Sequence, residues 1–324
     1  MIPLISIIIP TYNRAHMLGE TLDSIKSQTF TDWECLVVDD GSSDDTATVV
    51  GKYVLEDARF SYLKRPEDLP KGANSCRNFG LDQSRGQYIQ WFDSDDLMVK
   101  TKLHKQLSLL DNSNYDYCVA QTTFIDTNSG EDLGVRNERM QSENPLPDFI
   151  QFKIFWLTGA VLWKKDFLMT SGLRFDPDLQ QAQDYDFHIR ALGLSTNYIA
   201  EDSILMRYKC HGDNMSVSFT NNPQKIWSNA RVKEKILNNY THILPDSFIQ
   251  KKYEELLAQY KLCLRKNYLK EAKRIARILD KSLDKLNFTP SKKRGIRWRI
   301  GLVYISLGWL KRGDNLLKNR HVFG

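Results

Sequence analysis

The sequence predicts an α/β domain, built on a mostly parallel mixed sheet flanked by helices, and an all-helical C-terminal extension. Through the first part of the chain, short β-branched apolar runs alternate with helical patterns of about 10–15 residues, as in an α/β sheet. From residue 224 onward the apolar spacing is helical throughout. The charge of the chain also changes sign near that point.

The net charge of +5 hides this division. Residues 1–224 contain 21 Lys and Arg against 32 Asp and Glu, a net charge of −11, whereas residues 225–324 contain 24 against 8, a net charge of +16. Parts of opposite charge are expected to have different partners. We therefore expect two domains, an α/β domain over residues 1–222 and a basic helical extension over residues 223–324.

Cysteine usage and the apolar runs indicate a cytoplasmic location. The five cysteines are scattered and form no CxxC pair, which favours reduced thiols. The N-terminal run lacks the basic segment and cleavage site of a signal peptide, so we interpret it as a strand. No apolar run reaches the roughly 18–20 residues that span a bilayer.

The individual elements follow from the spacing of apolar residues. The apolar, β-branched run 4–10 indicates a strand that is covered on both faces. The predicted strands are 4–10, 33–38, 60–63, 88–92 and 117–126. Apolar residues recurring every three or four positions indicate helices. The predicted helices are 17–25, 45–55, 72–84, 100–110 and 181–192. The polar segment 128–147 predicts a loop.

Polar clusters follow three of the predicted strands. They are TYNR at 11–14, DDGS at 39–42 and DSDD at 93–96. Ligands of open α/β sheets bind beyond the carboxyl ends of the strands. Each cluster alone could be a solvated turn, but three at equivalent strand ends, two of them acidic, indicate one site.

The third cluster places Asp93, Asp95 and Asp96 within four positions, where their charges repel. A hard cation such as Mg²⁺ binds one or two carboxylates together with substrate phosphate oxygens, which offsets the repulsion. The alternative is a solvated turn in which Asp96 caps the next helix. Residues 37–45 leave a similar choice, because a carboxylate there could bind a base or ribose, or could cap a helix.

In combination these motifs resemble the family 2 glycosyltransferases, which have the Rossmann-like GT-A fold. The motifs are SIIIPTYNR (6–14), VVDDGSSDDT (37–46), KGANSCRNFGL (71–81), FDSDD (92–96), SGLRFDPDL (171–179), QDYDFHIRA (183–191) and RYKCHGDNMS (207–216). The resemblance covers roughly residues 3–220. It implies transfer of a sugar from a nucleotide-diphosphate donor, UDP-linked in most cases.

The resemblance also implies which residues bind the donor. The expected set is Pro10, Thr11, Tyr12, Arg14, Asp40, Arg77, Asp93 and Ser94. The ring of Tyr12 would stack on the base, which Asp40 would read. Arg77 would meet the donor phosphate or sugar, and Asp93 would face ribose or sugar hydroxyls.

The catalytic and metal-binding positions come from the same resemblance. Asp95 would bind Mg²⁺ or Mn²⁺ on the diphosphate, with His211 close to the metal. Asp184 falls at the position of the catalytic base, where it would deprotonate the acceptor hydroxyl during inverting attack on the sugar. The chain departs from the family in having Gln183, rather than glutamate, before that aspartate. Asp186 is a fallback base.

The sequence leaves other interpretations open. A nucleotidyltransferase would usually carry a Gly-rich, basic signature after the first strand, which the sequence lacks. An inactive scaffold with the same fold is a further alternative. Cys210 and His211 form an isolated pair, which argues against zinc. Trp91, Trp156 and Trp163 are expected in the core, with Trp156 the best candidate for an acceptor platform.

The basic extension predicts a contact with an anionic membrane surface. Residues 268–286 form an amphipathic, lysine-rich helical pattern that could equally pack on neighbouring helices with a solvated basic face. Residues 292–312 combine Trp298, Tyr304 and Trp309 with basic flanks, as in a helix that lies in the membrane plane. No nucleic-acid recognition motif accompanies the charge. We therefore expect a peripheral protein on the inner membrane face, acting on a glycan or lipid-linked acceptor in cell-surface polysaccharide synthesis.

Overall fold

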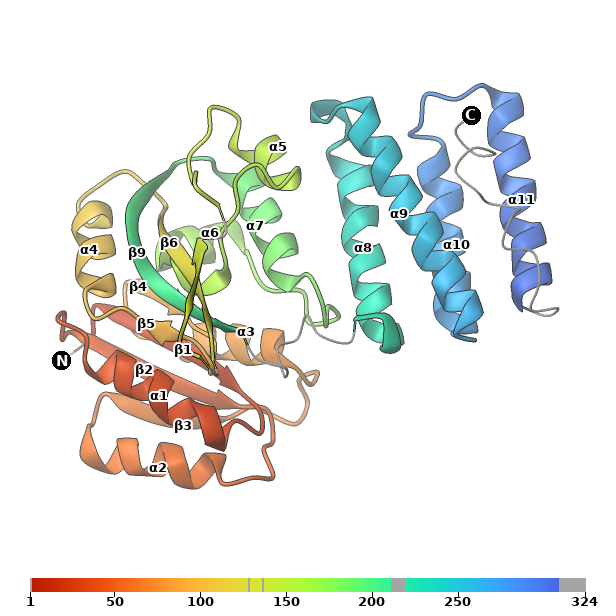
Figure 1. Ribbon diagram of the computed structural model, residues 1–324. Helices are drawn as coiled ribbons and strands as arrows, with labels where there is room; N and C mark the ends of the chain where they lie inside the picture. Colours follow the sequence, from red (N-terminus) through yellow and green to blue (C-terminus); the bar gives the residue numbers. More distant parts are fainter. Residues whose placement is uncertain (1, 128, 136, 211–218, 309–324) are drawn as a thin grey trace. The chain divides into compact units, whose positions relative to one another are not determined.

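The computed structural model describes residues 2–127, 129–135, 137–210 and 219–308 (Figure 1). The chain divides into two compact units. Unit 1 comprises Met1–Asp178 with Gln183–Asn214, and unit 2 comprises Leu179–Ala182 with Met215–Gly324.

Unit 1 is built on a nine-stranded sheet of order β3-β2-β1-β4-β8-β6-β9-β5, with β7 paired to β6 (Figure 1). The strands are β1 Ile5–Thr11, β2 Trp33–Asp39, β3 Phe60–Lys64, β4 Tyr88–Trp91, β5 Leu97–Met98, β6 Tyr117–Asp126, β7 Asp132–Val135, β8 Val161–Lys164 and β9 Tyr198–Cys210. The α-helices of unit 1 are α1 Ala15–Lys26, α2 Thr46–Glu56, α3 Ala73–Gln83, α4 Lys102–Leu110, α5 Pro145–Ile150, α6 Lys165–Ser171 and α7 Gln183–Leu194.

The apolar character of the first strands follows from their position in the sheet. β3, β2, β1 and β4 pair in parallel, and every residue of β1, β2 and β4 is buried. Helices cover both faces of such a sheet, so no polar face is needed. From β4 onward the sheet is mixed, because β8 runs antiparallel to β4 and β6, whereas β9 runs parallel to β6. The expected mixed α/β sheet is confirmed.

Two parts of the sheet differ from the prediction. The predicted loop 128–147 is wrong in part, because it contains β7 and the start of α5. The 13-residue strand β9 was not predicted, since its exposed side carries polar and charged residues and gives no continuous apolar run. β7 is exposed along its whole length, so it too has no apolar signature.

Unit 2 is helical, as the sequence predicts. Its α-helices are α8 Pro223–Asn239, α9 Asp246–Arg265, α10 Leu269–Leu283 and α11 Pro290–Gly308. Helix α10 packs against α8 and α9, with Ala272, Ile275 and Leu279 fully buried. The amphipathic pattern of α10 therefore builds the core of unit 2 and leaves the basic residues outside. Within the described part of the chain, no helix combines the length and apolarity needed to cross a membrane.

A glycine allows α3 to lie directly on the sheet. A Cβ at Gly80 would collide with Cγ2 of Ile8 and lie 3.3 Å from Cγ2 of Val38. We expect Gly80→Ala to lower the free energy of unfolding by about 1–3 kcal/mol through overpacking. Gly51→Ala in α2 is the matched control, because nothing lies within 4 Å of its Cβ position. There the gain in helix propensity should stabilise by roughly 0.5–1 kcal/mol. Denaturant unfolding measures both, and equal effects would contradict the close packing.

Candidate functional site

The carboxyl ends of β1, β2 and β4 lie side by side and carry the three polar clusters. Thr11 is in register with Asp39, and the backbone N–H of Asp40 donates to the carbonyl of Thr11 at 2.9 Å. Phe92, directly before the third cluster, donates its N–H to the carbonyl of Ile8 at 3.0 Å. The structure thus brings the three clusters to one edge of the sheet.

The first two clusters are also tied to each other through their loops. Asn13 has a positive φ of 50°, an unusual conformation that asparagine tolerates. Its N–H donates to Oγ of Ser42 at 2.9 Å, and its Oδ1 accepts from the N–H of Ser43 at 2.8 Å. Beside it, Nε of Arg14 lies 3.9 Å from Oδ2 of Asp95. Arg14 therefore links the first cluster to the third.

The two adjacent aspartates of the second cluster have different surroundings. Asp39 is buried and accepts hydrogen bonds from the N–H and hydroxyl of Ser42 and, at 2.8 Å, from the hydroxyl of Tyr62. Burial and this carboxylate raise the pKa of Tyr62. Asp39 therefore holds the loop in shape, while Asp40, the residue expected to read the base, is half-buried at the loop surface.

Asp40 has a partner that the sequence did not reveal. Nε of Arg65 lies 2.5 Å from Oδ1 of Asp40, and the same guanidinium donates to the carbonyls of Pro66 and Leu69. These bonds orient one oxygen of Asp40. Tyr12 is 54% exposed, so its ring surface is accessible for stacking. A single arginine after a short strand gives no sequence signal of this pairing.

A buried arginine connects the third cluster to α3. Arg77 is 1% exposed; Nη2 donates to Oδ1 of Asp93 at 2.6 Å, and Nη1 donates to Oδ1 of Asn74 at 3.0 Å. Burial lowers the pKa of Arg77, but the carboxylates of Asp93 and Asp184 outweigh it and hold that pKa above its ordinary value. The expectation was a contact with donor phosphate or sugar. The observed geometry shows Arg77 orienting Asp93.

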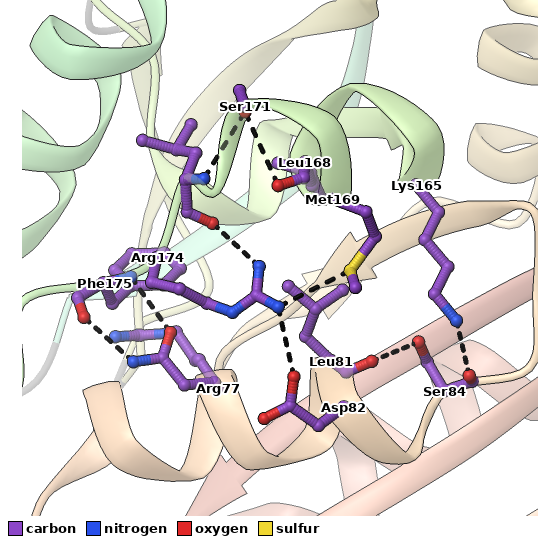
Figure 2. Close-up of polar contacts among 12 residues, drawn as sticks. Arg77, Leu81, Asp82, Ser84, Lys165, Leu168, Met169, Ser171, Arg174 and Phe175 are labelled. Atoms are coloured by element: carbon purple, nitrogen blue, oxygen red, sulfur yellow. Dashed lines mark hydrogen bonds and ion pairs between the residues drawn. The ribbon is translucent and has the colours of Figure 1, made fainter.

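The segment before α7 is hydrogen-bonded to helix α3, which carries Arg77 (Figure 2). The side chain of Asn78 donates to the carbonyl of Phe175 and accepts from its N–H, both at 2.9 Å. Arg174 reaches from this segment to Oδ1 of Asp82 at 3.1 Å. The ring of Phe175 lies 5.0 Å from the guanidinium of Arg77. These contacts hold the segment that precedes Asp184 against the helix that carries Arg77.

Asp96 is not a helix cap, so that prediction is wrong. Helix α4 begins at Lys102. Instead Asp96 is 1% exposed; Oδ1 accepts from the N–H of Lys209 in β9 at 3.0 Å, and its carbonyl accepts from the hydroxyl of Thr21. Burial, followed by the charge of Asp95 and of the other carboxylates, raises the pKa of Asp96 well above its usual range.

Asp184 and Asp186, both in the first turn of α7, are clearly different. Oδ2 of Asp184 accepts from the N–H of Thr158 at 3.2 Å, and the residue is half-buried. Asp186 is 3% exposed and forms an ion pair with Arg190 at 2.8 Å. The fallback base is therefore committed to an ion pair within its own helix, while Asp184 remains accessible.

An aromatic pair beside Asp184 was not predicted. Phe152 is 44% exposed and has a φ of 60°, an outlier for so bulky a residue. Its ring stacks on Tyr185 with centroids 4.5 Å apart. Trp156, the expected platform, is buried at 3% exposure, and Trp91 and Trp163 are fully buried in the core.

The remaining predicted residues are placed as follows. Pro10 and Thr11 are buried at the end of β1, and Ser94 is 7% exposed between the two half-buried aspartates of the third cluster. His211 lies outside the described residues. No group of three or more His, Cys, Asp and Glu side chains suited to a metal occurs among the residues that the structure describes.

The carboxylates of the third cluster nevertheless fit a divalent cation that is held mainly by its substrate. Mg²⁺ takes one or two protein carboxylates and completes its shell with phosphate oxygens and water. Asp93 and Asp95 are half-buried beside Asp96, and their charges raise its pKa. A cation would relieve this repulsion.

The sequence profile of glycosyl transferase family 2 matches residues 6–168, half of the chain. The chain belongs to this family. Within this family 2 glycosyltransferase, the matched region contains the three strand-end clusters and Arg77 but ends before Asp184.

Two curated relatives agree with the assignment. An uncharacterized glycosyltransferase of Rickettsia typhi is 30% identical over 215 residues, which are 64% of this chain and 64% of that protein. The Escherichia coli protein WfgD, named UDP-Glc:alpha-D-GlcNAc-diphosphoundecaprenol beta-1,3-glucosyltransferase, is 36% identical over 126 residues, 39% of this chain and 48% of its own. The family 2 chain thus spans less than two thirds of either relative.

A solved structure supports the fold over nearly the whole chain. Staphylococcus aureus TarS 1-349, in complex with UDP-GlcNAc, is similar with a TM-score of 0.63 and 20% identity. The likeness covers 94% of this family 2 chain and 89% of the TarS chain. The expected GT-A fold is confirmed.

The raised pKa of Asp96 leads to a pH-dependent prediction. A carboxyl group with a raised folded-state pKa stabilises the fold fully below its unfolded pKa of about 4, and this contribution is lost as the pH rises toward the folded value. We therefore expect the Tm difference between Asp96→Asn and the parent chain to shift in favour of the variant as the pH rises from 4 to 8, by at least about 2 °C. Thermal unfolding without metal or nucleotide measures the difference.

The control for this experiment is Asp68→Asn, at an exposed loop position. Because the comparison uses the change in the Tm difference with pH, any constant packing cost of the new amide cancels. A Tm difference for Asp96→Asn that is flat across this range would contradict the electrostatic description of the cluster.

Proposed function

We propose that this chain is a metal-dependent, inverting glycosyltransferase that moves a sugar from a UDP-linked donor to a glycan or lipid-linked acceptor. One observation carries the proposal. The buried guanidinium of Arg77 binds Asp93 of the strand-end cluster, and the helix that carries Arg77 is hydrogen-bonded to the segment that leads to Asp184. This arrangement supports a common site for the acids expected on the donor side and on the acceptor side.

The donor side is supported by two accessible groups. Asp40 is half-buried, with one oxygen oriented by Arg65, and can accept a hydrogen bond from a base N–H. The exposed ring of Tyr12 offers a stacking surface. Asp93, held by Arg77, would face ribose or sugar hydroxyls.

The leaving diphosphate needs positive charge, which the acidic cluster itself does not provide. Mg²⁺ or Mn²⁺ bound at Asp95, when present, would stabilise the negative charge that develops on the diphosphate. Arg14, 3.9 Å from Asp95, is the cationic side chain of the first cluster. It would add a second, metal-independent positive charge.

Asp184 is the proposed base. The N–H of Thr158 orients one carboxylate oxygen, and a carboxylate within about 3 Å of an acceptor hydroxyl can take its proton as the new bond forms. Attack from the side opposite the diphosphate inverts the anomeric carbon. The exposed Phe152 ring, stacked on Tyr185, would offer an apolar surface to an acceptor sugar.

The proposed acceptor follows the printed name of a relative, and the proposed location follows the charge of the C-terminal residues. WfgD carries a diphosphoundecaprenol acceptor in its name, and residues 225–324 of this chain have a net charge of +16. A lipid-linked acceptor would be met at a membrane, and a basic extension would hold the enzyme against its anionic inner face. A role in cell-surface polysaccharide synthesis follows from such an acceptor.

Each rival function has one requirement that distinguishes it from the proposed sugar transfer. A nucleotidyltransferase would consume a sugar phosphate and a nucleoside triphosphate, for which no triphosphate-binding signature follows the first strand. An inactive scaffold would not require an accessible Asp184 beside an ion-paired Asp186.

Replacing the base tests the mechanism. We expect Asp184→Asn to lower sugar transfer by about 10²- to 10⁴-fold, because proton removal is lost, while UDP binding stays within twofold. A panel of UDP-sugars with a GlcNAc-diphosphoryl-lipid acceptor provides the assay. Asp166→Asn, an exposed acid in the first turn of α6, is the control and should retain activity. Transfer by Asp184→Asn close to the parent rate would exclude Asp184 as the base.

Ligand stabilisation tests the donor and metal sites without requiring an acceptor. Saturating UDP with Mn²⁺ should raise the Tm of the parent chain by several degrees, since about 3 kcal/mol is gained at a hundredfold excess over Kd. UDP with a chelator should raise it less. Asp95→Asn should abolish the difference between these two conditions. An identical shift with and without Mn²⁺ in the parent chain would rule out a metal-dependent donor site.

A further inference from the structure

Helix α11 has apolar residues on two opposite faces. Ile296, Ile300 and Val303 are buried, and the helix packs against α9 and α10. Trp298 is 67% exposed and Ile305 is 56% exposed. Residues at i, i+4 and i+7 share a helix face, so the first three form one face and Trp298 and Ile305 belong to another.

The second face is completed by Leu302, which is half-buried. We call Trp298, Leu302 and Ile305 the outer face of α11. A helix normally buries its apolar faces, so a helix with an apolar exposed side as well as an apolar packed side is expected to contact a second apolar surface. Exposed tryptophan clustered with aliphatic residues marks an interaction site, unlike a single exposed apolar side chain.

The surroundings of the outer face are basic. Residues 269–308 contain 11 Lys and Arg against 3 Asp and Glu. Arg294, one turn before Trp298 on the same side of the helix, is exposed. On α10 and just after it, exposed basic side chains recur along one side. These are Lys270, Lys273, Arg277, Lys281 and Lys285, which we call the α10 stripe.

The few acids of these helices do not neutralise the stripe. Asp280 and Asp284 both pair with Arg297 of α11, at 2.6 Å and 3.0 Å, and Glu271 is buried. Nζ of Lys273 lies 6.0 Å from the ring centroid of Tyr304. These contacts also place the α10 stripe along the edge of α11, so positive charge borders the apolar outer face.

We propose that the outer face of α11 inserts into the interface of an anionic bilayer, with Arg294 and the α10 stripe binding lipid phosphates. Trp298 would lie at headgroup depth, where an amphipathic ring is favoured. This deepens the proposed membrane location, on which it rests, by naming the residues that make the contact. A nucleic acid would suit the charge but not the aliphatic residues, and a second copy of this chain would bring like charges together.

Vesicle binding by the full-length chain tests the inference. The parent chain should sediment with phosphatidylglycerol-containing vesicles and not with pure phosphatidylcholine vesicles, and high salt should weaken the binding. Trp298→Ala with Ile305→Ala should weaken binding at least tenfold at unchanged charge. Arg277→Glu with Lys281→Glu should weaken it by about 25-fold or more, since each basic residue near the surface contributes roughly fivefold.

Matched controls come from unit 1. Leu55→Ala removes a 90% exposed leucine of α2, and Lys52→Glu reverses an exposed charge on the same helix; neither should change vesicle binding. Circular dichroism verifies that each variant is folded. As an independent readout, brominated phosphatidylglycerol should quench fluorescence in the parent chain, and the quenching should be lost in Trp298→Ala.

Several outcomes would overturn the inference. The first is equal binding to neutral and anionic vesicles. The second is unchanged binding by the outer-face variant, Trp298→Ala with Ile305→Ala. The third is that an aqueous quencher fails to reach Trp298 in the absence of vesicles. Concentration-dependent dimerisation abolished by the outer-face variant would identify a second copy as the occupant instead. Donor hydrolysis in free solution needs no vesicle, so its failure with intact vesicle binding would refute only the proposed function.

Discussion

The site of unit 1 depends on a buried positive charge. A guanidinium removed from water is stable only when carboxylates and hydrogen-bond acceptors surround it. Arg77 meets this requirement through Asp93 and Asn74 and through the field of Asp184. The charge thereby fixes the first carboxylate of the strand-end cluster and compensates part of the negative charge that the other acids add.

The residues that surround Arg77 come from distant parts of the chain. Asn74 reaches the carbonyl of Asp176 at 2.7 Å, and Asn78 makes two hydrogen bonds with Phe175. Helix α3 is therefore bonded to the segment that leads toward α7. The close packing of α3 on β1, which the small side chain of Gly80 allows, sets the height of this arrangement above the sheet. Sheet packing and site geometry are consequently linked through one helix.

The sequence predicts those elements whose structure is determined by a local pattern of residues. Fully buried strands such as β1 and β2 show themselves as apolar runs, and the clusters that end them are read directly from the same stretches. The exposed β7 and the half-polar β9 have no such pattern, because their place in the sheet is decided by pairing with β6. The resemblance to the family supplied the roles, and the structure assigns Asp39 to the loop and leaves Asp40 accessible.

The pairings within the site were beyond sequence reasoning for the same physical reason. Arg65 with Asp40, Lys209 with Asp96, and Thr158 with Asp184 each join residues at least 25 positions apart. Spacing does not encode such contacts, since they depend on how the sheet brings the elements together. Asp96 shows the consequence most clearly. As a turn residue it would be a solvated cap, whereas the end of β9 encloses it and turns it into a buried acid.

The division of charge between the units has a physical consequence for a donor that is itself an anion. An acidic site repels a nucleotide diphosphate unless positive charge accompanies it, and Arg77 is already bound to Asp93, which leaves Arg14 as the cationic side chain beside Asp95. A divalent cation that arrives with the diphosphate would satisfy both the proposed donor and the cluster. The +16 charge of residues 225–324 belongs to a different unit of the chain, so the acidic site and the basic helices require separate explanations.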